Sequence, residues 1–429
     1  MKRLYKKALA VLLLLLLLSG CQKPEVQEEI PVITDSTPEK VEEEAAKPQT
    51  DLKLITYSSG LINSGCAYNR AGVYLLESDG ETVSGHMEYI DFASGKRIYL
   101  SNQLDVTFDE TNPGWIKDVS GGCVPMADDT HLYFYLGESG GNNPPRFVQA
   151  DLNGTNRKEL VVPELSVVRG GSAVASGGNV LYYLADDYNS VQNGSPAIAL
   201  YAADFDKMSV ERVCEISTAS FGFIVGAHEN CLLIQSASPT EGLWQTALYD
   251  VVNNSYTGQA FLYDLRKTKR IASENTVYYI EESERILKAF DLLTGEERIL
   301  TDLSSQFDDI NSKIYFDQDI YDGRLLISFY KDQNVPYKCF VVDLATGELK
   351  DFTLTFEGLF GTEYIRVMAA NEKYYFVFNR MEDTKQMRLG EDGEPVERIV
   401  EDYAGALIEI ENYWNSTAAF IPITDTRNS

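Results

Sequence analysis

The feature that most constrains the fold is a repeat of short apolar segments along residues 51–429. They are rich in Val, Leu, Ile, Tyr and Phe, which favour β-strands, and they recur at intervals of about 45 to 60 residues. The copies are VYLLES (73–78), LYFYLG (132–137), VLYYLA (180–185), LLIQSA (232–237), VYYIEE (277–282), LLISFY (325–330) and YYFVFN (374–379). The sequence therefore predicts an all-β repeat.

Two kinds of turn accompany these strands. Most are preceded by a dipeptide that tolerates positive φ, as hairpin turns require: Asp128-Asp129, Gly178-Asn179, Glu229-Asn230, Glu274-Asn275, Asp322-Gly323 and Asn371-Glu372. A second kind of turn follows each apolar segment. It consists of an Asp, an apolar residue, a Gly or Asn turn and then a charged strand. These copies are IDFASGKRIYL (90–100), ADLNGTNRKEL (150–160), ADFDKMSVERV (203–213), YDVVNNSYTGQ (249–259), FDLLTGEERIL (290–300), VDLATGELKDF (342–352) and a degenerate MRLGEDGEPVERIV (387–400).

Four antiparallel strands repeated at 40–50 residues are typical of a β-propeller blade. Seven copies predict seven four-stranded blades, with six or eight as alternatives. Blade boundaries are expected near 58–101, 117–162, 168–216, 220–263, 267–302, 313–355 and 362–401. Residues 403–429 are expected to pair with residues 52–57, which would close the ring or build an eighth, composite blade.

The recurring D-L-x-T-G-E hairpin and the paired strands resemble the bacterial extracytoplasmic propellers of quinoprotein-like, Tol-type and related families. That resemblance implies the fold but indicates almost nothing about catalytic activity, since many such propellers act as scaffolds or recognition modules. The adjacent Cys-Cys pair and tryptophan docking motifs of quinoprotein dehydrogenases are absent from the sequence, as are sialidase-type Asp boxes.

The N-terminus carries the pattern of an export signal. Four basic residues precede an apolar run from Ala8 to Leu18, and about 16 Å of helix is too short to span a bilayer. Leu18-Ser19-Gly20-Cys21 then resembles the lipobox of bacterial lipoproteins. The resemblance implies a signal peptide over residues 1–20 and a diacylglyceryl group on Cys21. An ordinary signal peptide with a chance cysteine is the alternative.

Residues 21–50 differ in composition from the rest of the chain. After Cys21 they hold four prolines and the run Glu42-Glu43-Glu44, without any aromatic residue. Such a segment buries too little apolar surface to order itself, so we expect a spacer between lipid and propeller. The predicted location is the outer side of a cell membrane, extracellular or periplasmic. Gln22 is not the Asp that resembles an inner-membrane retention signal.

The charge balance limits the partners. The 65 acidic and 37 basic residues give a net charge of −28, which argues against nucleic acid because such partners need clustered Lys and Arg. The widely spaced cysteines Cys66, Cys123, Cys214, Cys231 and Cys339 form no disulfide framework. Cys214 and Cys231 could bridge, or both could be isolated thiols. We expect a monomer.

No pattern of catalytic or metal-ligating residues stands out, and no cofactor is predicted. His86, His131 and His228 are isolated from one another and are expected at surfaces or turns. Residues 317–323 superficially resemble a calcium loop, but Tyr321 occupies the position of the third ligand. A hairpin turn at Asp322-Gly323 is the better interpretation.

Three long loops occupy the same position in their blades: residues 137–146, 186–196 and 236–244. We expect them on one face of the propeller, where longer loops commonly mark a binding surface. Trp115 and Trp244 could stack on a ligand or pack in the core. The main functional hypothesis is a membrane-tethered, non-enzymatic binding or scaffolding module for a protein, peptide or glycan. The alternatives are an envelope glycan hydrolase or lyase using channel carboxylates, and an assembly factor.

Overall fold

The computed structural model describes most of the chain after its first 50 residues. The described residues are 51–56, 66–78, 84–101, 111–117, 119, 122–138, 143–192, 194–217, 221–238, 242–306, 313–316, 319–331, 336–358, 361–389 and 395–426. They belong to one compact unit, Pro48–Ser429. None of the helices in these ranges is long and apolar enough to cross a membrane. Cys21 and both N-terminal segments lie outside the described residues.

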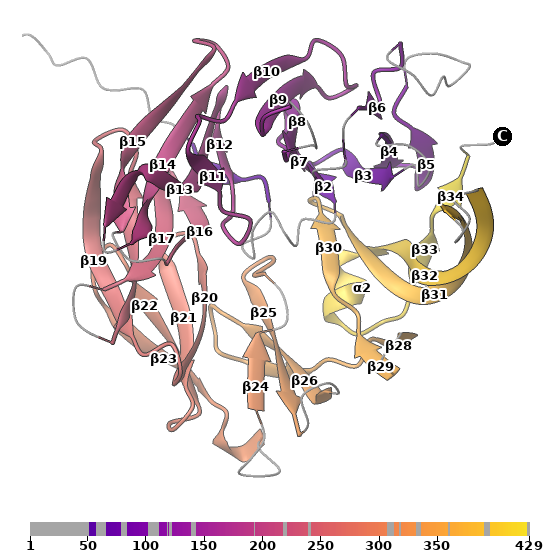
Figure 1. The fold of residues 1–429 in the computed structure, drawn as a ribbon. Helices are drawn as coiled ribbons and strands as arrows, with labels where there is room; N and C mark the ends of the chain where they lie inside the picture. The colour runs from indigo at the N-terminus through magenta and orange to yellow at the C-terminus, as the bar shows by residue number, and fades with distance from the viewer. Residues whose placement is uncertain are drawn as a thin grey trace, which may run out of the picture. The chain divides into compact units, whose positions relative to one another are not determined.

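Seven blades of four antiparallel strands follow one another along this unit, so the predicted seven-bladed propeller is confirmed (Figure 1). Blade 1 holds β2 (Ala67–Tyr68), β3 (Gly72–Ser78), β4 (Gly85–Asp91) and β5 (Lys96–Tyr99); blade 2 holds β7 (Cys123–Ala127), β8 (His131–Leu136), β9 (Arg146–Asp151) and β10 (Lys158–Val161); blade 3 holds β12 (Ala175–Gly177), β13 (Val180–Gln192), β14 (Ser195–Asp204) and β15 (Ser209–Ser217).

The remaining blades follow the same plan. Blade 4 holds β16 (Gly222–His228), β17 (Cys231–Ala237), β18 (Trp244–Asp250) and β19 (Ser255–Tyr263); blade 5 holds β20 (Thr268–Ser273), β21 (Thr276–Glu281), β22 (Ile286–Asp291) and β23 (Glu297–Asp302); blade 6 holds β24 (Lys313–Phe316), β25 (Arg324–Tyr330), β26 (Pro336–Asp343) and β27 (Leu349–Asp351); blade 7 holds β30 (Val367–Ala370), β31 (Tyr374–Leu389), β32 (Pro395–Glu409) and β33 (Phe420–Pro422).

Seven shorter elements complete the fold. They are β1 (Lys53–Leu54), β6 (Trp115–Ile116), β11 (Ser166–Val168), the hairpin of β28 (Thr355–Gly358) and β29 (Gly361–Tyr364), the C-terminal β34 (Thr424–Asp425) and the 3-10 helix η3 (Ser304–Gln306). β6 pairs with β4, and β11 pairs with β13. A five-residue helix, α2 (Ile410–Trp414), joins β32 to β33.

The strand order defines two faces of the propeller. The first strands of neighbouring blades contact one another, as β16 and β20 do, so they lie toward the central channel. Because direction alternates along each blade, the first-to-second and third-to-fourth connections share one face, which we call the turn face. The second-to-third connections lie on the opposite loop face. All three predicted loops connect second to third strands, so their common face is confirmed.

The Asp of the second signature caps the third-to-fourth turn, as the sequence predicts. In blade 6, Oδ1 of Asp343 accepts hydrogen bonds from the backbone N–H groups of Ala345 (3.0 Å) and Thr346 (2.9 Å). Gly347 follows at φ +76°. A Cβ there would lie 2.0 Å from the carbonyl oxygen of Leu300 in blade 5, so glycine also sets the spacing between the two blades.

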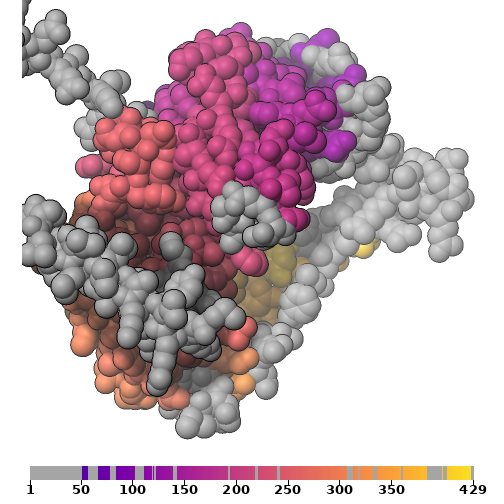
Figure 2. Space-filling model, turned by 60° about the vertical axis from the view of Figure 1, so that its left-hand side comes forward, coloured from indigo at the N-terminus to yellow at the C-terminus, as the bar shows by residue number. Residues whose placement is uncertain are grey.

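The hydrophobic core lies between neighbouring blades. Between blades 2 and 3, Phe147 packs on Tyr183 with ring centroids 4.7 Å apart, and both side chains are almost fully buried. Figure 2 shows consecutive blades in direct contact along their surfaces. Each sheet therefore buries its two faces against its neighbours, which is why a single blade cannot stand alone.

Ring closure differs in part from the expectation. Residues 403–429 supply the end of β32, the fourth strand of blade 7 and β34, which pairs in parallel with β5 of blade 1. The predicted partner, the segment around residues 52–57, is elsewhere: β1 pairs with β12 of blade 3. An eighth, composite blade is therefore wrong, because the two terminal segments belong to different sheets.

Two predicted elements have another conformation. Residues 387–400 were expected to be a third-to-fourth turn, but they lie in the long β31–β32 hairpin, with Leu389 opposite Pro395. The third-to-fourth connection of blade 7 instead contains α2. Residues 186–196 are largely strand, because β13 and β14 extend almost to the turn. β-Branched and aromatic residues in this stretch favour pairing.

Candidate functional site

The N-terminal strand β1 lies at the inner edge of blade 3, beside the central channel. Lys53 is opposite Ser176 and Leu54 is opposite Ala175. The N–H of Ile55 donates to the carbonyl oxygen of Val174 (3.0 Å), and the N–H of Leu52 donates to that of Glu229 in blade 4 (2.6 Å). The channel wall therefore holds an extended stretch of chain mainly through backbone groups.

The side chains of this segment differ in burial. Leu52 and Ile55 retain 3% and 7% of their exposure, whereas the Lys53 side chain retains 58%. A cavity of about 60 Å³ borders the segment. It is lined by Leu54, Ile55, Thr56, Cys66, Tyr68 and Ala127. The wall thus binds an extended peptide backbone and buries the side chains of Leu52 and Ile55.

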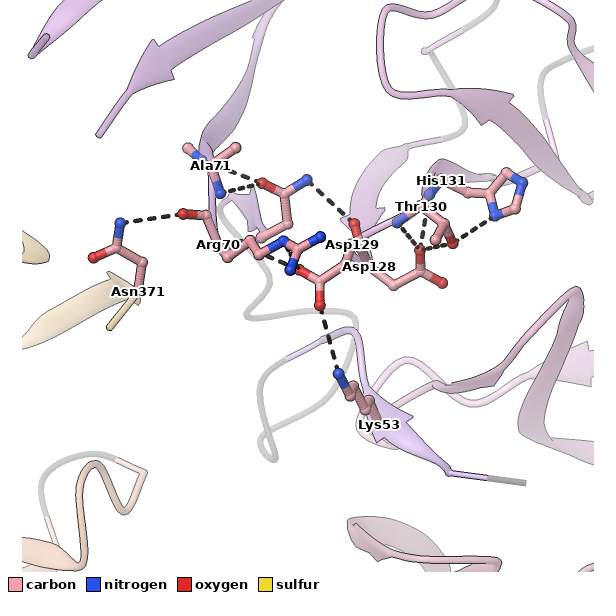
Figure 3. Close-up of polar contacts among 10 residues, drawn as sticks. Lys53, Arg70, Ala71, Asp128, Asp129, Thr130, His131 and Asn371 are labelled. Carbon is pink, nitrogen blue, oxygen red and sulfur yellow. Dashed lines mark hydrogen bonds and ion pairs between the residues drawn. The ribbon is translucent and has the colours of Figure 1, made fainter. Parts of the chain in front are cut away.

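Polar residues at the turn face contact the exposed side chain of Lys53. We call Lys53, Arg70, Asp128, Asp129 and Asn371 the channel-mouth cluster (Figure 3). Asp129 of blade 2 accepts from Lys53 Nζ at 3.5 Å and from the backbone N–H of Arg70 at 3.4 Å. Arg70 Nε lies 3.9 Å from the same carboxylate. Both cations are largely exposed, so each pair contributes little to stability.

Two asparagines tie blade 1 to its neighbours. Asn69 donates to the carbonyl oxygen of Asp128 (3.2 Å) and accepts the N–H of Ala71 (2.9 Å). Asn371 of blade 7 donates to the carbonyl oxygen of Arg70 (3.1 Å; Figure 3). The Arg70 turn of blade 1 is therefore held by both neighbouring blades, blade 2 and blade 7.

The seam between blades 1 and 7 contains an open cavity of about 420 Å³ next to the cluster. It is lined by Arg70, Ala71, Asp91, Phe92, Ala93, Asn371, Lys373 and Tyr374. Lys373 lies 4.0 Å from Glu409, and Arg70 lies 3.9 Å from Asp129. Both cations that line the cavity therefore already face a carboxylate. The seam pocket alone points to no particular ligand.

The channel-mouth turn also brings a hydroxyl, an imidazole and a carboxylate together. Thr130 Oγ1 lies 2.9 Å from His131 Nδ1 and 2.7 Å from Asp128 Oδ1. In a nucleophilic relay the carboxylate orients the imidazole, and the imidazole activates the hydroxyl. Here the carboxylate accepts from the hydroxyl itself and from the N–H groups of Thr130 and His131. The arrangement is a turn cap, not a relay.

The histidines are placed as predicted, with one exception. His131 begins β8, and His228 ends β16 at its turn. His86 was expected at a surface or turn, but it is 5% exposed on β4, where its ring meets Tyr99 edge-on at 5.8 Å. Aromatic packing between β4 and its neighbours buries it. No group of metal-ligating side chains is present among the described residues.

The cysteines of the propeller are free thiols, so Cys214 and Cys231 form no bridge. Burial raises the pKa of Cys123 to about 12 and that of Cys231 to about 11, and it also raises the pKa of Cys214. These thiols are therefore protonated at neutral pH and unsuited to act as nucleophiles. Asp322 and Gly323 form the predicted hairpin turn, with φ +48° and +65°.

The two tryptophans with a predicted role differ in their surroundings. Trp115 lies on β6, opposite His86. Trp244 stacks on Phe223 with ring centroids 6.3 Å apart and is partly exposed at the loop face.

The sequence predicted a strand at residues 52–57 but not its place beside the channel. The alternation of Leu52, Lys53 and Leu54 was a signal for a strand and carried none for its partner.

Comparison with known proteins finds remote structural similarity. No family model and no curated protein matches the chain. Among solved structures, puromycin hydrolase is 10% identical (82% of this chain, 62% of that one, TM-score 0.42). Acylaminoacyl peptidase of Pyrococcus horikoshii is 13% identical (79%, 52%, 0.44), and a post-proline cleaving enzyme of Rickettsia typhi is 10% identical (82%, 58%, 0.43). The chain spans about half to three fifths of each.

The comparison corrects the functional hypothesis. The structures named above, and two prolyl endopeptidases, are all hydrolases or peptidases by name. The expectation of a non-enzymatic binding or scaffolding module was therefore wrong. None of the structures named above is a quinoprotein or Tol-type protein, so that part of the resemblance stays a prediction.

Proposed function

We propose that this chain is a lipid-anchored propeller that takes part in peptide hydrolysis outside the cytoplasm, by holding extended substrate beside its central channel. The observation that carries the proposal is the seating of β1 against β12 of blade 3. The same wall would accept a peptide in place of residues 51–56.

Peptides fit this wall because its contacts are of two kinds. The backbone carbonyl oxygens of Val174 and Glu229 can accept hydrogen bonds from the N–H groups of any extended chain, and buried sites such as those of Leu52 and Ile55 select particular side chains. Added strands are recognised in this way at other sheet edges. The wall thus favours peptides with apolar residues three apart and a basic residue between them, as in the chain's own segment.

The proposal divides the work between binding and bond cleavage. The channel wall would orient the peptide, which lowers the entropic part of the barrier. The only hydroxyl–imidazole–carboxylate group described above, at Thr130, is a turn cap. We therefore propose peptide hydrolysis for this chain without assigning the cleaving groups to any of the described residues.

The membrane anchor is part of the same proposal. Lipid on Cys21 would place the propeller at the outer surface of the membrane, with residues 22–50 as the connection. Two acyl chains anchor a protein stably, since each buried CH₂ contributes about 0.8 kcal/mol. An anchored propeller would hydrolyse peptides at the membrane surface.

The proposal is tested by loosening the segment that occupies the wall. In the full-length chain, Leu52→Ala with Ile55→Ala removes two buried side chains, at a cost of about 2–5 kcal/mol each. A fluorescent peptide Asp-Leu-Lys-Leu-Ile-Thr should then bind at least about tenfold more tightly. Leu265→Ala, on an exposed turn, is the control and should leave binding unchanged.

Hydrolysis is measured with a quenched peptide of the same sequence. Membranes of cells lacking the chain should cleave it more slowly, and wild-type chain should restore the rate. Equal rates with and without the chain would contradict the role in hydrolysis. Failure of the double variant to bind the peptide better than the control would contradict the binding wall.

A further inference from the structure

An arginine between blades 4 and 5 lacks a partner of opposite charge. Arg270 on β20 stacks on Tyr263, with its guanidinium carbon 4.1 Å from the ring centroid, and donates from Nη2 to Gln235 Oε1 at 3.0 Å. None of the described residues forms an ion pair with it. Burial lowers the pKa of Arg270, as expected for a cation without an anion beside it.

This lack of a carboxylate is notable in a chain with 65 acidic residues. Several other half-buried arginines of the propeller are paired, as Arg169 is with Asp186 and Arg97 with Glu88, whereas Arg324 stacks on Trp414 without an ion pair to any described residue. Buried charges are normally paired because an unpaired one loses its hydration without compensation. A negative charge beside Arg270 would therefore compensate a cation that the described residues leave without an ion pair.

Hydrogen-bonding atoms beside Arg270 are also incompletely satisfied. Arg270 Nε, the Tyr263 hydroxyl and the Thr246 hydroxyl are buried and make no hydrogen bond of regular geometry, and the Tyr263 hydroxyl interacts with Arg270 and Thr246 beside it. Thr246 is 0% exposed and Tyr263 is 4% exposed. Burial raises the pKa of Tyr263, so its hydroxyl stays protonated and can donate. A guanidinium N–H and two hydroxyls thus meet between blades 4 and 5.

The surroundings of these donors are aromatic. Gln235, Trp244, Thr246 and Phe223 belong to paired positions of β16, β17 and β18, so they face the same side of blade 4. Phe221, half exposed, packs on Trp244 with ring centroids 5.4 Å apart. Arg270 itself is only partly buried, so solvent reaches part of its side chain.

We propose that Arg270, Gln235, Tyr263 and Thr246 form a binding site for a carboxylate group whose carbon skeleton is apolar or aromatic. The guanidinium would bind the two carboxylate oxygens, the hydroxyls would donate to them, and Trp244 and Phe221 would cover the apolar part. Guanidinium–carboxylate geometry is planar and bidentate, which suits this set of donors. The site is separate from the wall that holds β1, and this inference does not depend on the proposed function.

Two sources could supply such a group: a free aromatic acid, or the C-terminus of a peptide ending in an aromatic residue. Titration calorimetry of the full-length chain would use benzoate for the first and N-acetyl-Ala-Phe for the second, with N-acetyl-Ala-Phe-amide as the uncharged control. We expect at least one acid to bind and the amide to bind at least about tenfold more weakly. Equal binding of acid and amide, or no binding of either acid at about 10 mM, would overturn the proposal.

The residue test compares Arg270 on β20 with Arg266 on the turn that precedes this strand. Arg270→Met should weaken binding of the acid by at least about tenfold, because a charge-assisted hydrogen bond is lost. Arg266→Met, on the exposed turn before β20, should leave it unchanged. Unchanged binding to Arg270→Met would mean that the guanidinium only packs on Tyr263. Should that variant fail to fold by circular dichroism, Tyr263→Phe decides, with weaker binding expected and unchanged binding against the proposal.

Discussion

Gly347 connects the conformation of one residue to the spacing of two blades. Its φ of +76° and the carbonyl oxygen of Leu300, 2.0 Å from where a Cβ would lie, both exclude a side chain. Gly323 has a similar φ, +65°, with open space around it. Gly323→Ala should therefore cost about 1 kcal/mol of unfolding free energy, and Gly347→Ala at least about 2 kcal/mol more. Urea unfolding would measure both, and equal costs would show that blade spacing tolerates the methyl group.

The aspartates that cap the turns make stability depend on acid. Backbone N–H groups hold the pKa of Asp291 and Asp343 below the ordinary value of 3.8. Because the folded pKa lies below the unfolded one, this stabilisation is present above about pH 4 and is lost as the pH falls through the folded pKa. The thermal midpoint should therefore drop below about pH 4. Asp343→Asn should flatten that drop and Glu348→Gln should not; parallel profiles would contradict the assignment.

Among the strands, turns and helices, those that depend on a few adjacent residues are predictable from the sequence, and those that depend on distant parts of the chain are not. The second strands and the Asp-capped turns are predictable, because strand propensity and positive φ are properties of a few adjacent residues. The partner of β1 is not, because it depends on a channel wall built by residues 174–229. The same limit explains α2, which replaces a turn, and Arg270, whose site exists only after blades 4 and 5 pack together.

The C-terminal strand β34 closes the ring through few contacts. The N–H of Thr424 donates to the carbonyl oxygen of Gly95 (2.8 Å), and that of Thr426 donates to Arg97 (3.0 Å). Thr424→Pro with Thr426→Pro removes both donors. Hydrogen exchange of β5 and β30 should then become faster while exchange of blade 4 stays unchanged. The double alanine variant keeps both N–H groups and should exchange more like wild type; equal exchange in β5 for the two variants would contradict closure by β34.

For the whole molecule, the net charge of −28 and the predicted lipid act in different ways. Like charges keep the propeller soluble and repel anionic surfaces, so membrane attachment would depend on acyl chains at Cys21. Cys21→Ser should abolish incorporation of labelled palmitate and shift the chain from the membrane to the soluble fraction. Cys66→Ser, a buried thiol of the propeller, is the matched control and should remain lipidated. A Cys21→Ser chain that stays in the membrane fraction after a carbonate wash would contradict the anchor.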